Sequence, residues 1–92
     1  MRYKFLNSFE RSLQNLSLEE KKQIKKSLYQ LIDAFQSQTI TPGLGLKKVS
    51  SAIWELRVGL RLRVVFVLEE DLVKWSFVGN HDEVRRFIKS NK

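Results

Sequence analysis

The 92-residue chain has no cysteine, one proline and one histidine. Without cysteine, disulfides, thiolate nucleophiles and cysteine–zinc sites are excluded. The single proline and the lack of repeats or low-complexity tracts argue against a long disordered linker. No apolar run approaches the ~20 residues of a membrane span, and residues 1–20 lack the apolar centre of a signal peptide. The sequence predicts one cytoplasmic domain over residues 1–92, with no membrane partner.

Motifs for several cofactors are also missing. The chain carries no P-loop, no dinucleotide-binding fingerprint and no metal-binding motif, so no cofactor is expected. What the chain has in excess is positive charge: 17 Lys and Arg against 10 Asp and Glu give a net charge of +7. For so small a domain this favours a nucleic acid, an acidic protein or another anionic surface as the partner. The alternative is that the basic surface only aids solubility.

The first half of the chain predicts a strand and two helices. Residues 2–6 are expected to form a strand. Asn7 with Glu10, and Ser17 with Glu20, have the spacing of capping boxes, which mark helix starts. Apolar residues then recur at helical spacing, and we expect the two helices to pack as an antiparallel hairpin. The apolar positions are Phe9, Leu13 and Leu16 in the first helix, and Ile24, Leu28, Leu31, Ile32 and Phe35 in the second.

Four lysines occupy the remaining face of the second helix, in its N-terminal half. They could bind a polyanion, but the solvated side of any amphipathic helix has the same pattern. Residues 36–45 are expected to form the loop that follows, because Pro42-Gly43 is a turn signal. The lysines are Lys21, Lys22, Lys25 and Lys26.

The second half predicts three strands and a helix. Alternation over residues 53–68 indicates two strands joined by a tight turn at Gly59. Residues 72–78 form a third strand, apolar enough to be buried on both faces. Asn80 with Glu83 gives a capping box for the last helix. The fold is therefore α+β: an antiparallel meander with the N-terminal strand at its edge and the helix hairpin on one face. The other face should be partly open or covered by the last helix.

The hairpin over residues 53–68 has one apolar and one charged face. Leu60 and Leu62 should begin the apolar side of its second strand. The charged side gathers Glu55, Arg57, Arg61 and Arg63, and Arg57 and Arg61 should face each other across the turn. Arginines held on a rigid sheet are well suited to binding phosphate. Cross-strand Glu–Arg pairs also occur as plain structural salt bridges, and Trp54 and Trp75 are expected in the core.

The one histidine, His81, follows the third strand of the meander. That strand runs back beside the second, so His81 should lie near Arg61 and Arg63. Together these groups suit metal-free cleavage of RNA, in which the 2′-hydroxyl attacks the adjacent phosphate. His81 would be the acid or base, Glu55 the base, and the arginines would hold the phosphate. A histidine at a helix start is more often a surface residue, so this role is a hypothesis.

Four segments of the chain resemble the RelE/ParE superfamily of bacterial type II toxins. The resemblance implies a toxin neutralised by an acidic antitoxin, and for RelE-like members cleavage of mRNA in the ribosomal A site. By similarity, Arg57 and Arg63 line the concave face, His81 matches a C-terminal histidine, and Lys47 and Lys48 match a basic position that contacts RNA. The segments are Leu46-Lys47-Lys48-Val49, Trp54-Glu55-Leu56-Arg57-Val58-Gly59, Arg63-Val64-Val65-Phe66 and Val78-Gly79-Asn80-His81-Asp82.

Two other functions stay open at this point. ParE-like members of the same superfamily inhibit DNA gyrase and do not cleave RNA, in which case the arginine face would contact a protein. A chain with this fold could also have lost activity and only bind an antitoxin or nucleic acid.

Overall fold

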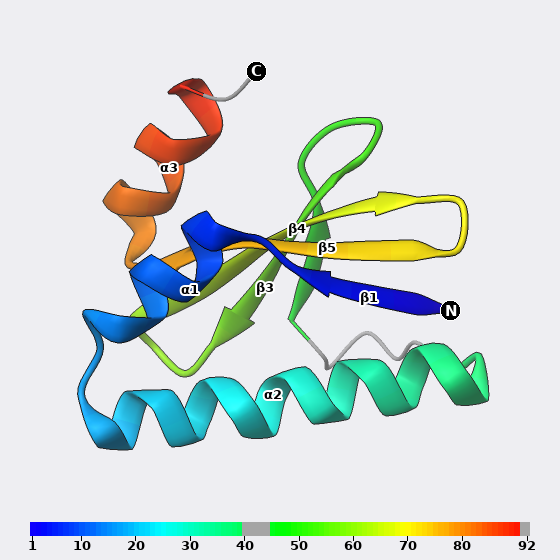
Figure 1. The fold of residues 1–92 in the computed structure, drawn as a ribbon, viewed down its shortest axis with the longest axis horizontal. Helices are drawn as coiled ribbons and strands as arrows, with labels where there is room; N and C mark the ends of the chain where they lie inside the picture. The colour runs from blue at the N-terminus through cyan, green and yellow to red at the C-terminus, as the bar shows by residue number, and fades with distance from the viewer. Residues whose placement is uncertain (40–44, 91–92) are drawn as a thin grey trace.

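A computed structural model of the chain describes residues 1–39 and 45–90. Five strands form one sheet in the order β1-β5-β4-β3-β2, with α2 and α3 on opposite sides of it (Figure 1). The predicted α+β class, with its helix hairpin, antiparallel meander and C-terminal helix, is confirmed. The elements are β1 (Arg2–Phe5), α1 (Asn7–Gln14), α2 (Leu18–Ser37), β2 (Leu46–Lys48), β3 (Ile53–Val58), β4 (Leu62–Glu69), β5 (Leu72–Gly79) and α3 (His81–Ser90).

The sheet contains one strand that the sequence did not predict. Strand β2 pairs antiparallel with β3, and the pairing places Lys47 opposite Glu55 and Lys48 opposite Trp54. Three residues, two of them lysines, give no alternation signal, and the strand is formed by pairing with its neighbour rather than by local preference. The predicted Pro42-Gly43 turn lies outside the described residues.

Helix α1 takes over the sheet edge where β1 ends. Strand β1 runs parallel to β5 only as far as Trp75. Beyond that point the Ser8 hydroxyl donates to the carbonyl of Ser76 at 2.6 Å, and the Ser12 hydroxyl accepts from the N–H of Val78 at 3.0 Å. Side chains one helical turn apart thus satisfy the backbone groups that a longer β1 would have paired.

Two of the three predicted capping boxes are present. Ser17 and Glu20 cap α2 reciprocally, whereas the Asn7 prediction is wrong: the N-cap position of α1 is Leu6, with no side-chain cap. Leu6 still donates its N–H to Trp75 as the last bond of the β1 edge, so the helix begins immediately after the strand. Helix α2 also includes residues 36 and 37, which were expected in the loop.

The core lies between the sheet and the two-helix layer. Both tryptophans contribute as predicted, Trp75 fully buried and Trp54 packed against the cluster from its margin. On the opposite face, α3 covers part of the sheet by stacking Phe87 on Phe77 with ring centroids 4.5 Å apart. The buried cluster comprises Phe9, Ile24, Leu28, Leu31, Leu56, Val58, Leu62, Val64, Phe66, Val73, Trp75 and Val78.

The turn at Gly59 is confirmed, with Gly59 at a φ of +64°. Strand β4 starts only at Leu62, so Leu60 and Arg61 belong to the turn. Leu60 is fully exposed and does not join the apolar face as predicted. No helix in the described ranges is long and apolar enough to cross a membrane.

Candidate functional site

A small polar cavity opens on the sheet face that faces away from α2. Its volume is about 330 Å³, and strands β2, β3 and β4 supply its walls. The lining side chains alternate along β3 with the core residues, so the same pleat builds the core on one face and this cavity on the other. We call the cavity the arginine pocket, and its residues are Gly45, Leu46, Lys47, Glu55, Arg57 and Arg63.

An ion pair fixes one of the two arginines. Arg63 Nη1 lies 2.6 Å from Glu55 Oε1, and the two side chains are only 27% and 11% exposed. So short a bond between partly buried charges holds the guanidinium in one place. Glu55 therefore serves as the ion-pair partner of Arg63. The sequence offered two readings of these residues, a phosphate site and a structural salt bridge, and this one contact belongs to both.

The other arginine, Arg57, keeps its charge available. It is exposed and sits directly opposite Arg63 in the β3–β4 register. Across residues 1–39 and 45–90 it forms no ion pair. Lys47 lies opposite Glu55 on the next strand. Three cations thus border one carboxylate, and the excess positive charge of the pocket suits a phosphate group.

Glycines flank the arginine pair at both ends of its register row. The carbonyl of Gly45 accepts a 3.0 Å bond from the N–H of Arg57, and a Cβ at Gly45 would lie 3.3 Å from the Arg57 carbonyl oxygen. On the other side Gly79 pairs with Arg63, and a Cβ there would meet Glu83 at 3.0 Å. Sequence reasoning gave neither glycine a role in the site, since only the register reveals which residues they neighbour.

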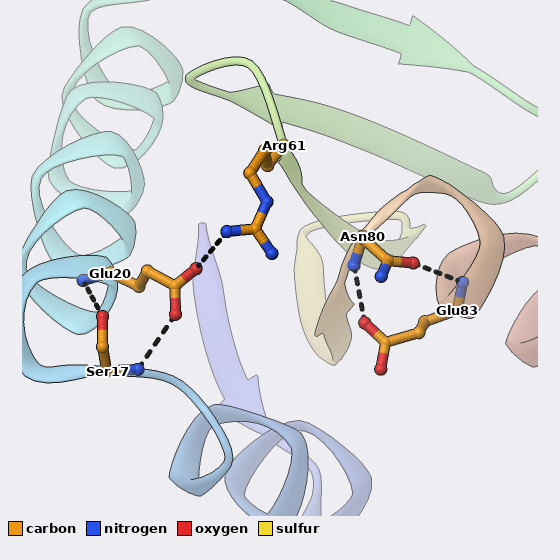
Figure 2. Close-up of polar contacts among 5 residues, drawn as sticks. All are labelled: Ser17, Glu20, Arg61, Asn80 and Glu83. Carbon is orange, nitrogen blue, oxygen red and sulfur yellow. Dashed lines mark hydrogen bonds and ion pairs between the residues drawn. The ribbon is translucent and has the colours of Figure 1, made fainter.

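Arg61 lies away from the pocket, contrary to the prediction. Figure 2 shows its guanidinium directed at Glu20 of α2, with 3.7 Å between Nη1 and Oε2. The turn after Gly59 removes Arg61 from the strand alternation, so the residue opposite Arg57 is Arg63. Arg61 lines a separate cavity of about 510 Å³ between α1, α2 and the start of α3.

The Glu20 carboxylate also takes part in the capping box at the start of α2. It accepts the N–H of Ser17 at 2.9 Å, and the Ser17 hydroxyl accepts the N–H of Glu20 (Figure 2). The hydrogen bond from the Ser17 N–H is the main cause that lowers the pKa of Glu20 below its ordinary value, and the nearby Arg61 contributes less.

His81 is an exposed residue at the start of α3. The capping box of Asn80 and Glu83 around it is present as predicted, with two 2.9 Å bonds (Figure 2). The strand topology is also as expected, because Gly79 pairs with Arg63. The His81 side chain nevertheless lines neither the arginine pocket nor the cavity of Arg61. Among the described residues it makes no side-chain hydrogen bond or ion pair.

The two predicted RNA-contacting lysines separate. Lys47 joins the arginine pocket, whereas Lys48 points to the other sheet face, its Nζ 5.7 Å from the centre of the Trp54 ring. The structure thus brings together Lys47, Glu55, Arg57 and Arg63, and leaves Lys48, Arg61 and His81 outside. No group of three or more His, Asp or Glu side chains suited to a metal ion occurs in the described part of the chain.

No protein-family model and no curated protein sequence matches this chain. Solved structures with the same fold are RelE in the RelB–RelE antitoxin–toxin complex of Methanococcus jannaschii, YafQ of E. coli and the YoeB dimer of Staphylococcus aureus. Identities are 17%, 12% and 15%, and TM-scores 0.69, 0.66 and 0.65. The matches cover 91%, 91% and 88% of this chain and 96%, 98% and 97% of theirs. The resemblance to RelE-like toxins is confirmed at the level of the fold.

Proposed function

We propose that this chain is the toxin of a type II toxin–antitoxin pair and that it cleaves mRNA on the ribosome at the arginine pocket. The observation that carries the proposal is the pair of facing arginines, one fixed by Glu55 and one free, on the fold of RelE-like toxins. The net charge of +7 suits both an RNA substrate and an acidic protein partner.

In the proposed reaction Arg57, Arg63 and His81 act on the RNA. The 2′-oxygen attacks the adjacent phosphorus while its proton passes to a water molecule of the solvent. The bond from phosphorus to the 5′-oxygen breaks, and that oxygen takes a proton from an acid. Arg57 and Arg63 offer their N–H groups to the phosphate oxygens, whose charge grows in the transition state. Because Arg63 is already oriented by Glu55, little reorganisation is needed when the phosphate enters.

Glu55 and His81 have different roles in this proposal. Glu55 is only 11% exposed and bonded to Arg63, so we assign it the positioning of Arg63 in preference to the base role expected from sequence. His81 is exposed just beyond Gly79, the neighbour of Arg63, and adjacent strands lie ~4.8 Å apart. An RNA strand running from the pocket across Gly79 would approach the imidazole, which could then protonate the leaving oxygen.

Partners follow from the same proposal. RelE, YafQ and YoeB have been solved in complexes named for RelB, DinJ and YefM, two of them named as toxin–antitoxin or antitoxin–toxin complexes. An acidic antitoxin is therefore the proposed stable partner, and the ribosome with its mRNA is the proposed target. Lys47 and Lys48 would add contacts to the RNA backbone from β2.

The test is controlled expression of the chain in bacteria with mapping of new mRNA 5′ ends. We expect growth arrest and cuts within translated codons, and loss of both when Arg57, Arg63 and His81 are replaced together by alanine. Full toxicity in that triple variant would contradict the proposed site. Arrest with DNA-damage signals and intact mRNA would instead identify a gyrase inhibitor, and absence of arrest would identify an inactive binding module.

A further inference from the structure

The cavity that Arg61 lines contains side chains that the proposed reaction does not use. Its volume is about 510 Å³, which is within the range of sites for small ligands. Part of its wall is apolar and is formed by Leu16, Leu62 and Phe77, with Phe87 stacked on Phe77. A flat ring can pack against such a wall, and the polar groups beside it determine which ring fits.

The start of α3 brings two polar side chains with unused hydrogen-bonding capacity to the same cavity. Asn80 Oδ1 accepts the N–H of Glu83, and Glu83 Oε1 accepts the N–H of Asn80, both at 2.9 Å (Figure 2). These bonds fix both side chains. Among the described residues they leave the Asn80 amide nitrogen and Glu83 Oε2 without a hydrogen-bond partner. The lining thus holds a donor group and a carboxylate next to each other.

The charged side chains of the cavity fall into two groups. Arg61 and Glu20 lie 3.7 Å apart and balance each other's charge. Arg11 on α1 and Glu83 on α3 also line the cavity, and neither forms an ion pair within residues 1–39 and 45–90. A complementary ligand therefore brings hydrogen-bond donors to Glu83 and an anionic group to Arg11.

These requirements select guanine among the RNA bases. Next to its carbonyl oxygen guanine presents two adjacent donor groups, N1–H and the N2 amino group, whereas adenine, cytosine and uracil each lack such a pair. A carboxylate offers about four acceptor positions, and the capping bond uses one of those on Glu83. We propose that this cavity binds a guanine base: Asn80 donates to the carbonyl oxygen, Glu83 accepts from the two donors, and Arg11 binds an attached phosphate.

The position of the cavity connects it with the arginine pocket. Asn80 directly follows Gly79, which pairs with Arg63, so the cavity begins next to the row of residues that carries the two arginines. An RNA strand with its phosphate in the arginine pocket would bring a neighbouring base to the cavity. A free guanine nucleotide carries the same base and phosphate. The guanine is common to both sources, and only its assignment to mRNA rests on the proposed function.

Binding is measured by NMR titration of the whole chain with guanosine monophosphate (GMP) and with the adenosine, cytidine and uridine monophosphates. GMP should bind at least about tenfold more tightly than the others, as expected for a paired base edge. Glu83→Gln keeps an oxygen for the capping bond but loses the second acceptor, and it should abolish this preference. Asp82→Asn, the matched control, removes the same charge outside the lining and should retain the preference. The same spectra show whether each variant is folded.

Arg11 provides a variant with a different expected result. Arg11→Ala should weaken binding of all four nucleotides by about threefold to tenfold without changing their order, because a phosphate contact carries no base information. Arg85→Ala, which removes an exposed arginine outside the lining, should stay within about twofold of wild type. Equal binding of the four nucleotides, no binding, or a guanine preference that survives in Glu83→Gln would overturn the proposal.

The mapped mRNA 5′ ends distinguish the two sources of the base. If the guanine belongs to mRNA, cuts should lie beside guanines, and Glu83→Gln should extend them to other bases. If GMP binds selectively and the cuts show no such bias, the site stands and its ligand is the free nucleotide. If GMP binds selectively and no mRNA is cut, the site stands and the proposed function fails.

Discussion

Two Arg–Glu pairs, separated by a single residue on the β4 side of the hairpin, differ in almost every physical respect. Arg63 and Glu55 lie 2.6 Å apart and are 27% and 11% exposed, whereas Arg61 and Glu20 lie 3.7 Å apart and are 77% and 24% exposed. Only Leu62 stands between the arginines. Arg63 lies inside the strand and its charge is fixed, whereas Arg61 lies inside the turn and its charge is solvated.

The difference shows that an arginine is better placed to bind a phosphate where the backbone around it is rigid. Arg63 is held by sheet pairing on both sides, to Arg57 and to Gly79, and its side chain is held by Glu55. Arg61 projects from a turn into solvent, where a long ion pair is screened and adds little. Only the first arrangement can present a guanidinium to a phosphate without further ordering.

The largest effect should come from removing Arg63, the fixed arginine. Arg63→Ala is expected to reduce mRNA cleavage about 10²–10³-fold, the usual loss when one preorganised donor to the transition state is removed. Arg61→Ala, the matched control two residues away, should stay within about twofold because its exposed pair contributes little. Cleavage is followed by primer extension in a translation reaction. Comparable losses in the two variants would show that the pocket is not the site.

A smaller effect is expected at the carboxylate of the fixed pair. Glu55→Gln keeps an oxygen that can accept from Arg63 but removes the charge, so a positioning role predicts about a tenfold loss of cleavage and an unchanged pH profile. A general base contributes about 10²–10⁴-fold and shapes the pH profile. A loss in that range, with the profile altered, would restore the base role for Glu55.

The two ion pairs should also differ in how much they contribute to the free energy of unfolding. A double-mutant cycle with Glu55→Gln and Arg63→Ala should give a coupling of about 1 kcal/mol in the free energy of unfolding, as for contacting charges of low exposure. The same cycle with Glu20→Gln and Arg61→Ala should give no measurable coupling. Glutamine can keep the capping bond of residue 20, so that cycle isolates the ion pair. Urea unfolding at low salt measures both, and a larger coupling at the turn would reverse the ranking.

Much of this architecture could be predicted from local patterns. Period-two alternation identified β3 and β4, and a largely apolar run identified β5. Reciprocal Ser17–Glu20 and Asn80–Glu83 spacing identified the starts of α2 and α3. These signals are contained in a few neighbouring residues. Strand β2 was missed because its pairing with β3 bridges a loop, and Asn7 was misassigned because the β1 edge bond of Leu6 determines where α1 begins.

The site residues that lie on regular strands could be predicted from the alternation of side chains. Glu55, Arg57 and Arg63 lie within regular strands, so their common face followed from the pleat. Arg61 was placed wrongly because the length of a turn decides where alternation resumes, and a single glycine does not reveal that length. The glycines beside Arg57 and Arg63 were missed because their positions depend on the register between strands.

The smallest effect should be seen in the acid titration of Glu20. Its pKa is lowered below its ordinary value, chiefly by the hydrogen bond from the Ser17 N–H and only in part by Arg61. A carboxyl group with a lowered pKa in the folded state stabilises the fold at pH values above its unfolded-state pKa. That contribution is lost as the pH falls through its folded-state pKa. In Arg61→Ala the pKa of Glu20, measured by carboxyl NMR, should rise slightly and stay below the ordinary value of a glutamate because the bonds to Ser17 remain. A full return to the ordinary value would mean that the ion pair is the main cause of the lowered pKa. Arg61 would then be held more firmly than its exposure and its 3.7 Å separation from Glu20 indicate.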